Sequence, residues 1–138
     1  MVRLTRAGEC AIRGMVRLAK MNGGDGLALI ADIAREEGVS KAFLAKQFQR
    51  LVRAKLVESS RGASGGVALA RPASEITLRD IVEAVEGRIE LNECLSAAER
   101  CKNAETCALS AIWREAQEKM LDVLSKATLA QIVGMKPN

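Results

Sequence analysis

A break of only two residues between two predicted helices constrains the fold of this chain more than any other feature. The first helix covers residues 29–37 and stops at Gly38, which readily takes the left-handed conformation that ends helices. Ser40 is a good N-cap for the second helix, whose apolar stripe includes Leu44 and Phe48. Two helices joined by so tight a turn predict a helix-turn-helix.

A β-hairpin is predicted directly after this motif. Residues 56–59 and 67–70 form short apolar runs on either side of a glycine-rich turn, and Pro72 closes the unit. A hairpin in this place is a wing, so the first half of the chain reads as a winged helix-turn-helix.

Helical periodicity extends on both sides of this unit. Residues from about 4 to 21 predict an amphipathic helix, and Thr77, with Asp80 three residues later, predicts a capped helix that stops at Gly87. A long apolar pattern follows at 108–132. This last helix needs a partner, either the chain's own first helix or, as we favour, a second subunit, because operator-binding helix-turn-helix proteins are commonly dimers.

The composition supports a mainly α fold with a small β-hairpin wing and a long C-terminal dimerisation helix. Hydrophobic residues make up 49% of the chain, but the aromatic ones are only Phe43, Phe48 and Trp113, so an aliphatic and mostly helical core is expected. We assign residues 1–72 to the DNA-binding region. Residues 73–138 would hold a bracing helix, a cysteine loop at about 88–108 and the dimerisation helix.

Charge divides along the same boundary. Residues 1–72 carry 13 Lys and Arg against 6 Asp and Glu, net +7, whereas residues 73–138 carry 8 against 11, net −3. The positive half is the candidate polyanion-binding half. The sequence shows neither a membrane-spanning apolar run nor a signal peptide, and we expect a cytoplasmic protein.

The polar face of the second helix of the motif offers side chains that suit a DNA major groove. Residues near its N-terminus come closest to the bases in such motifs, and later cations touch phosphates. In the wing, an arginine at the tip suits a minor groove, with glycine beside it for close approach. The candidate base-contacting residues are Ser40, Lys41, Ala42 and Lys46, the phosphate-contacting residues are Arg50 and Arg53, and the wing residues are Arg61 and Gly62.

Three cysteines, Cys94, Cys101 and Cys107, lie within fourteen residues of a chain that has one other cysteine, Cys10, and no histidine. Thiolates are soft ligands that select zinc, copper(I) or iron–sulfur clusters. Gaps of six and five residues are wider than the two to four typical of structural zinc sites, so a larger inorganic core fits them better.

Taken together, these motifs resemble the IscR/NsrR/RirA regulators, bacterial winged-helix transcription factors of the Rrf-two type. The resemblance is carried by Leu4-Thr5-Arg6, by the segments 40–48, 61–66 and 81–85, and by the three cysteines followed by Ala111-Ile112-Trp113. It implies a homodimer on promoter DNA in which the three cysteines hold an iron–sulfur cluster, with a 4Fe-4S centre favoured over a 2Fe-2S centre.

The resemblance also implies a fourth, non-cysteine ligand. The IscR-like branch uses a histidine where this chain has Ser110. The NsrR-like branch uses an acidic residue near the N-terminus of the other subunit, and Glu9 occupies that position. Cys10 is the rival, although a lone helical cysteine is most often a small buried hydrophobe.

The predicted function is therefore a transcriptional regulator, a repressor, that senses iron–sulfur status, nitric oxide or oxidant. A zinc-bound regulator and a metal-free thiol switch of the same fold are the alternatives. An enzyme is not expected, because no histidine base, phosphate-binding loop or recognisable carboxylate pair is present.

Overall fold

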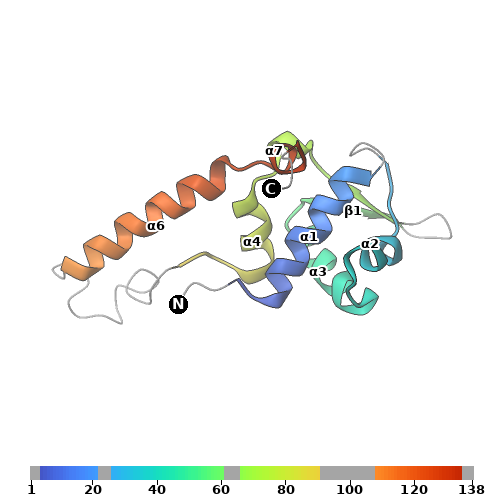
Figure 1. The fold of residues 1–138 in the computed structure, drawn as a ribbon, viewed down its shortest axis with the longest axis horizontal. Coiled ribbons are helices and arrows are strands. Elements are labelled where there is room, and N and C mark those ends of the chain that lie inside the picture. The colour runs from blue at the N-terminus through green and yellow to red at the C-terminus, as the bar shows by residue number, and fades with distance from the viewer. Residues whose placement is uncertain (1–3, 22–25, 61–65, 91–107, 135–138) are drawn as a thin grey trace.

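The computed structural model describes residues 4–21, 26–60, 66–90 and 108–134 (Figure 1). The elements are mostly helices, with one small sheet between the third and fourth of them. In chain order they are α1 (Arg6–Lys20), α2 (Ile30–Glu37), α3 (Lys41–Arg53), β1 (Val57–Ser60), β2 (Gly66–Leu69), the 3-10 turn η2 (Ala73–Glu75), α4 (Leu78–Glu86), α6 (Ala108–Lys126) and α7 (Leu129–Gly134).

The helix-turn-helix is confirmed as α2 and α3. Gly38 ends α2 with a φ of 66°, in the left-handed region that favours glycine. The Ser40 hydroxyl caps α3 by accepting a hydrogen bond from the Phe43 backbone N–H at 3.2 Å. The turn between the helices is thus fixed by the residues that the sequence indicated.

The wing is confirmed as an antiparallel pair in which Val57 faces Leu69 and Ser60 faces Gly66. A third segment extends this sheet, because Ala28 exchanges two backbone hydrogen bonds of 2.8 Å with Val67. The wing is therefore tied through Val67 of β2 to the segment that leads into α2.

Gly66 makes this tie possible. A Cβ at this position would lie 2.6 Å from the Ala28 carbonyl oxygen, which is backbone and cannot move independently. Gly66→Ala is therefore expected to lower the free energy of unfolding by about 1–3 kcal/mol. Urea denaturation measures the loss, and Gly134→Ala is the control because a Cβ there meets nothing within 4 Å. Equal stability of the two variants would contradict this account.

The core forms where α1 packs between α3 and α4 (Figure 1). As the composition predicts, its fully buried side chains are mostly aliphatic, with Phe48 as the aromatic member. Side chains that follow residue 72 share this core with those of α1–α3; they are Ile76, Ile81, Val85 and Leu129. Helices α4 and α7 thus belong to the packing unit that supports α3, the second helix of the helix-turn-helix.

The predicted cap of α4 is confirmed. The Thr77 hydroxyl accepts from the Asp80 N–H at 3.1 Å, and the Asp80 carboxylate accepts from the Thr77 N–H at 3.0 Å. This reciprocal capping box fixes where α4 begins, and Gly87 ends the helix.

The prediction of one continuous helix over 108–132 is wrong. The chain breaks at residues 127–128, where the backbone pairs with η2 and α4 through Leu78 N–H to Ala127 O at 2.8 Å and Leu129 N–H to Ile76 O at 2.7 Å. Thr128 and Gln131 then form a second capping box that starts α7. The break lets Leu129 enter the core and places α7 against α1.

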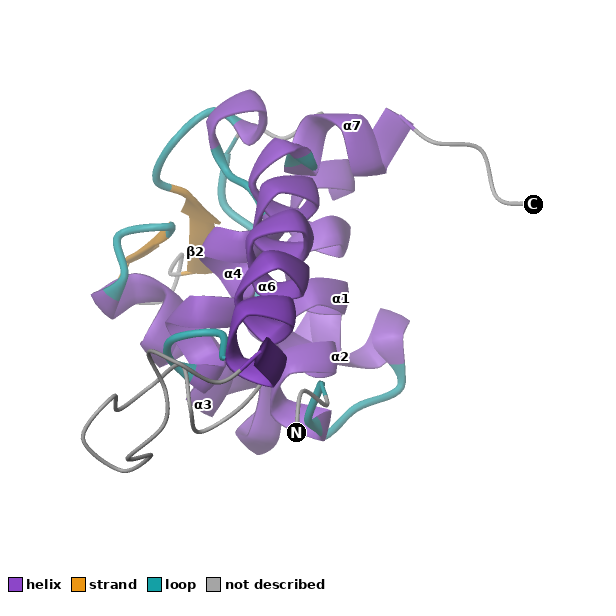
Figure 2. Cartoon of the chain, turned by 90° about the vertical axis from the view of Figure 1, so that its left-hand side faces the viewer, coloured by secondary structure: helices purple, strands orange, loops and turns teal. Residues whose placement is uncertain are grey.

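Helix α6 projects away from the core and crosses in front of α4 when the molecule is turned by 90° (Figures 1 and 2). Of its residues only Ser110 is buried. The side chains of Leu109, Ile112 and Val123 are 63%, 59% and 65% exposed. No helix in the described ranges is both long enough and apolar enough to cross a membrane.

Candidate functional site

The N-terminal half of α3 presents an exposed polar face. Ser40, Lys41, Ala42 and Lys46 are all exposed, and the first turn carries no acidic residue. The opposite face holds the buried Leu44, Phe48 and Leu51 that fix the helix on the core. The four predicted base-contacting residues therefore share a free surface on a rigidly supported helix.

Arg50 lies differently. Its side chain is half-buried, and its Nη1 donates to the Val85 carbonyl of α4 at 3.1 Å and to the Gln47 Oε1 at 3.5 Å. Arg53, one turn nearer the C-terminus, is exposed. The two arginines predicted to touch phosphate thus occupy different environments.

Several predicted site residues lie outside the described residues. These are the wing residues Arg61 and Gly62 and the three cysteines Cys94, Cys101 and Cys107. The described chain leads up to the cysteine segment at Glu90 and resumes after it at Ala108, the first residue of α6. In the described ranges, no three side chains of the metal-binding types gather as a ligand set.

Glu9 and Cys10 are adjacent on α1 but have opposite environments. Glu9 is exposed in the first turn, whereas Cys10 is 5% exposed and belongs to the core. Burial raises the pKa of the Cys10 thiol against the opposing effect of the Arg13 and Arg6 charges. Because the thiolate is the form that binds metal, this environment makes Cys10 a poor ligand and matches its interpretation as a buried hydrophobe.

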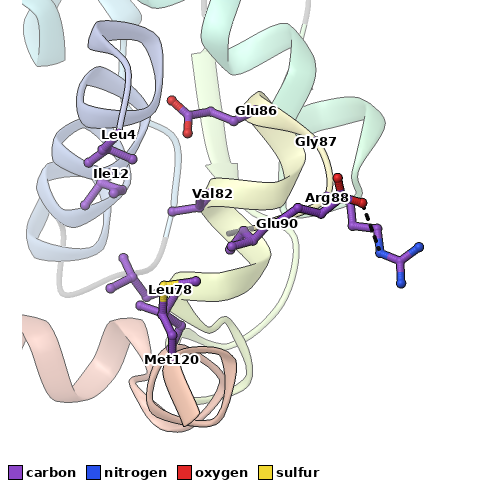
Figure 3. Close-up of a pocket in the computed structure, with 11 residues that line it drawn as sticks. Leu4, Ile12, Leu78, Val82, Glu86, Gly87, Arg88, Glu90 and Met120 are labelled. Atoms are coloured by element: carbon purple, nitrogen blue, oxygen red, sulfur yellow. Dashed lines mark ion pairs between the residues drawn. The ribbon is translucent and has the colours of Figure 1, made fainter. Parts of the chain in front are cut away.

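The start of α1 is joined to the end of α4. The Thr5 backbone N–H donates to Glu86 Oε1 at 2.6 Å, and the Thr5 hydroxyl makes a second contact with the same oxygen. Beside this contact lies a cavity of about 320 Å³ between α1, α4 and α6. Figure 3 shows Leu4 and Ile12 on one side of it and Val82 and Glu86 on the other.

Comparison with known proteins identifies the family to which this architecture belongs. A family model described as "Rrf2: Iron-dependent Transcriptional regulator" matches residues 4–135. The chain belongs to the Rrf2 family. It is therefore a transcriptional regulator of winged-helix fold and not a member of an enzyme family.

Curated Rrf2 relatives match almost the whole chain. Protein aau3 of Rhizobium meliloti is 42% identical over 99% of this chain and 88% of its own length. A putative HTH-type transcriptional regulator of Neisseria meningitidis is 35% identical over 99% of this chain and 91% of its own. The HTH-type transcriptional regulator IscR of Erwinia tasmaniensis is 33% identical over 96% of this chain and 79% of its own.

Solved structures show the same fold. CymR, the global cysteine regulator of B. subtilis, aligns over 99% of this chain and 100% of its own with a TM-score of 0.76 and 28% identity. The T. potens IscR structure aligns over 99% and 94% with a TM-score of 0.76 and 25% identity. The similar structures thus include one described as a global cysteine regulator and one described as IscR.

The donor set fits an iron–sulfur cluster, and one feature of the described residues supports that fit. Ser110 is 1% exposed, and its Oγ has no hydrogen-bond partner among the described residues. A buried hydroxyl left unpaired costs about 1–3 kcal/mol. Ser110 stands three residues after Cys107 in the sequence, so a polar group follows the cysteine segment directly.

Proposed function

We propose that this Rrf2 protein is a promoter-binding repressor that senses iron–sulfur status, nitric oxide or oxidant through a cluster. Cys94, Cys101 and Cys107 would hold the cluster, with Glu9 of the other subunit as the fourth ligand and a 4Fe-4S form favoured. The observation that carries the DNA-binding part is the exposed face of α3. When bound, the cluster would supply iron that reacts with nitric oxide and oxidants.

The proposed DNA contact is made by α3 in the major groove and by the wing beside it. Lys41 and Lys46 bring positive charge to the N-terminal half of α3, where the helix dipole is also positive. Ser40 and Ala42 are small enough for the backbone to come close to base edges. Arg61 and Gly62 at the wing tip would read the neighbouring minor groove.

The proposed homodimer forms through α6. This helix is about 28 Å long at 1.5 Å per residue. It leaves Leu109, Ile112, Trp113 and Val123 exposed on the described surface. The last three stand three, four and fourteen residues after Leu109, so they lie on the same side of the helix, where a second helix can cover them. A dimer also brings two recognition helices to two half-sites, as operator binding requires.

A thiol switch without metal is the second candidate function, and a similar solved structure supports it. The oxidised form of Staphylococcus aureus CymR aligns over 99% of this chain with a TM-score of 0.77 and 28% identity. In that case Cys94, Cys101 or Cys107 would be oxidised reversibly, and no iron would be bound. A zinc-bound regulator would be colourless and inert to redox change.

One experiment separates these functions. The protein is purified without oxygen, its absorption spectrum is recorded, and iron, zinc and acid-labile sulfide are quantified on the same sample. Binding to a fluorescent duplex, selected by the protein from random sequence, is then measured before and after cluster removal. Visible charge-transfer bands with matching iron and sulfide, and a change in affinity, support the cluster sensor. A colourless protein after reconstitution overturns it, and zinc or an oxidant-dependent affinity then selects between the alternatives.

Glu9→Ala tests the fourth ligand. The exposed carboxylate in the first turn of α1 is free to serve a cluster, so its removal is expected to shorten the cluster lifetime and shift the visible bands. The measurement is the decay of visible absorption in air. Cys10→Ala is the matched control, because loss of the neighbouring buried thiol should lower folding stability and leave the bands in place. An unchanged spectrum and cluster lifetime in Glu9→Ala would show that Glu9 is not the fourth ligand.

Ser110→Ala separates folding from cluster retention. In the cluster-free protein the substitution removes a buried hydroxyl that has no hydrogen-bond partner among the described residues, and it is expected to raise the free energy of unfolding by up to about 1–3 kcal/mol. In the loaded protein it is expected to shorten the cluster lifetime. Ser125→Ala on the same helix should instead destabilise slightly, because Ser125 Oγ accepts from Arg79 Nη1 at 3.4 Å. Destabilisation of the cluster-free protein by Ser110→Ala would show that the hydroxyl is already paired.

A further inference from the structure

Two consecutive residues at the C-terminal end of α4, Val85 and Glu86, bind different helices: Val85 binds α3 and Glu86 binds the start of α1. A helix leaves its last four carbonyls without partners inside the helix, and the end carries a partial negative charge. Here the Glu83 carbonyl accepts a hydrogen bond from the Gly87 N–H at 3.0 Å, and the Val85 carbonyl accepts one from the guanidinium of Arg50 at 3.1 Å. A positive side chain from the recognition helix therefore caps α4.

The Arg50 guanidinium is held in this orientation from within α3. Gln47 is 1% exposed, its Nε2 donates to the Phe43 carbonyl at 3.2 Å, and its Oε1 faces Arg50 Nη1. Turning Arg50 outward to a phosphate would leave the Val85 carbonyl and the buried Gln47 oxygen without this donor. Leaving buried polar atoms unpaired costs free energy, so the observed orientation is favoured.

On the other side of the same end, Glu86 binds the start of α1 through Thr5. The next residue of α1, Arg6, lies over the ring of Phe43 in α3, 5.9 Å from its centroid. Three contacts therefore close a ring of helices: α4 to α1 through Glu86, α1 to α3 through Arg6, and α3 to α4 through Arg50. Directly after this ring the chain runs through Glu90 toward the cysteine segment.

We propose that Arg50 is a positioning residue that couples the cysteine segment to DNA binding by capping α4, and that it does not contact phosphate. The proposal rests on the function proposed above. A contact can transmit a signal only if its free energy differs between two states, and the Arg50 contact is the direct hydrogen bond from α3 to the end of α4 among the described residues. A shift of the α4 end would then change the position of α3 on the core, while the side chains on the exposed face of α3 would keep their arrangement on the helix.

Arg50→Gln and Arg53→Gln provide a matched test, since both remove one positive charge from the last turn of α3. Binding to the selected fluorescent duplex is measured for cluster-loaded and cluster-free protein over a series of salt concentrations. Removing a phosphate contact lowers the slope of log K against log salt by about 0.9. Removing a coupling contact instead reduces the ratio of the two affinities, which is about 5–150-fold in typical allosteric proteins.

For Arg50→Gln we expect the wild-type salt slope and an affinity ratio that moves toward one. For Arg53→Gln we expect a reduced slope and an unchanged ratio. A reduced slope with an intact ratio in Arg50→Gln would make Arg50 a phosphate contact and overturn the proposal. If Arg50→Gln does not fold, as judged by its thermal unfolding, Arg50→Met retains the apolar stem and gives the same two readouts.

Failure of the proposed function is distinguishable from failure of this inference. A wild-type protein without a cluster shows no cluster-dependent ratio, and this result counts against the sensing function. The salt slopes still decide the role of Arg50 in that case, because they need only DNA binding. A normal wild-type ratio that Arg50→Gln leaves unchanged counts against the inference alone.

Discussion

Replacing Cys101 by alanine is expected to reduce the iron and sulfide content of the purified protein to background and to abolish its visible absorption. The physical reason is the small number of soft ligands in the chain. Only four cysteines are present and histidine is absent, so no spare side chain of comparable ligand strength can replace a lost thiolate. Cys10 is a poor substitute, because it is packed in the core and burial raises the pKa of its thiol, which disfavours the thiolate that would bind iron.

The same substitution should leave the DNA-binding fold intact. The core of the described residues is formed mainly by side chains of α1–α4 and of the wing strands. Cys101→Ala is therefore expected to bind DNA with the affinity of the cluster-free wild-type protein, and nitric oxide should no longer change that affinity. Iron analysis and fluorescence anisotropy on one preparation give both results. Retention of a full iron complement would show that Cys101 is not a ligand.

This experiment also separates the cluster from the thiol switch. A thiol-switch protein would contain no iron before the substitution, and Cys101→Ala would change only its response to peroxide. A zinc protein would lose zinc and would respond to neither agent. Each of the three modes of sensing thus predicts its own combination of metal content and DNA-binding response.

Local signals in the sequence predicted most of the fold, because those signals act over three or four residues. Gly38 and Ser40 set the turn of the helix-turn-helix, and Thr77 with Asp80 set the start of α4; each works through its own backbone or an adjacent N–H group. Sequence patterns are reliable for such contacts, since both partners are read from one short segment.

Contacts between distant segments were not predictable in the same way. The break in the C-terminal helix depends on pairing of residues 127–129 with residues 76–78, although the Thr128 and Gln131 capping box was a readable signal. The hydrogen bond of Arg50 depends on a carbonyl 35 residues away, so a helical wheel alone groups Arg50 with Arg53 as a candidate for phosphate contact. The close approach at Gly66 likewise involves Ala28, and nothing near residue 66 reveals it.

Phe48→Ala is expected to have the largest effect on stability. The Phe48 side chain is 1% exposed at the centre of the face that α3 turns to the core. Truncation of a buried phenylalanine to alanine costs about 3–5 kcal/mol, a large share of the 5–15 kcal/mol that stabilises a typical domain. Urea denaturation should show this loss, and DNA binding should weaken with it, because the exposed face of α3 depends on this support. Phe43→Ala, which removes a half-buried ring from the same helix, should cost much less.

A second substitution tests whether the loss arises from the contact between α3 and α1. A Cβ on Gly14 would lie 2.8 Å from Phe48 Cε2, so Gly14→Ala alone is expected to destabilise the protein through overpacking. In the Phe48→Ala background the same methyl group enters the space left by the ring, and it should recover part of the lost stability. The double-mutant cycle should therefore show a favourable coupling of about 0.5–3 kcal/mol. Additive effects would mean that the helices move apart or collapse independently of this contact, and that α1 does not hold the recognition helix at Phe48.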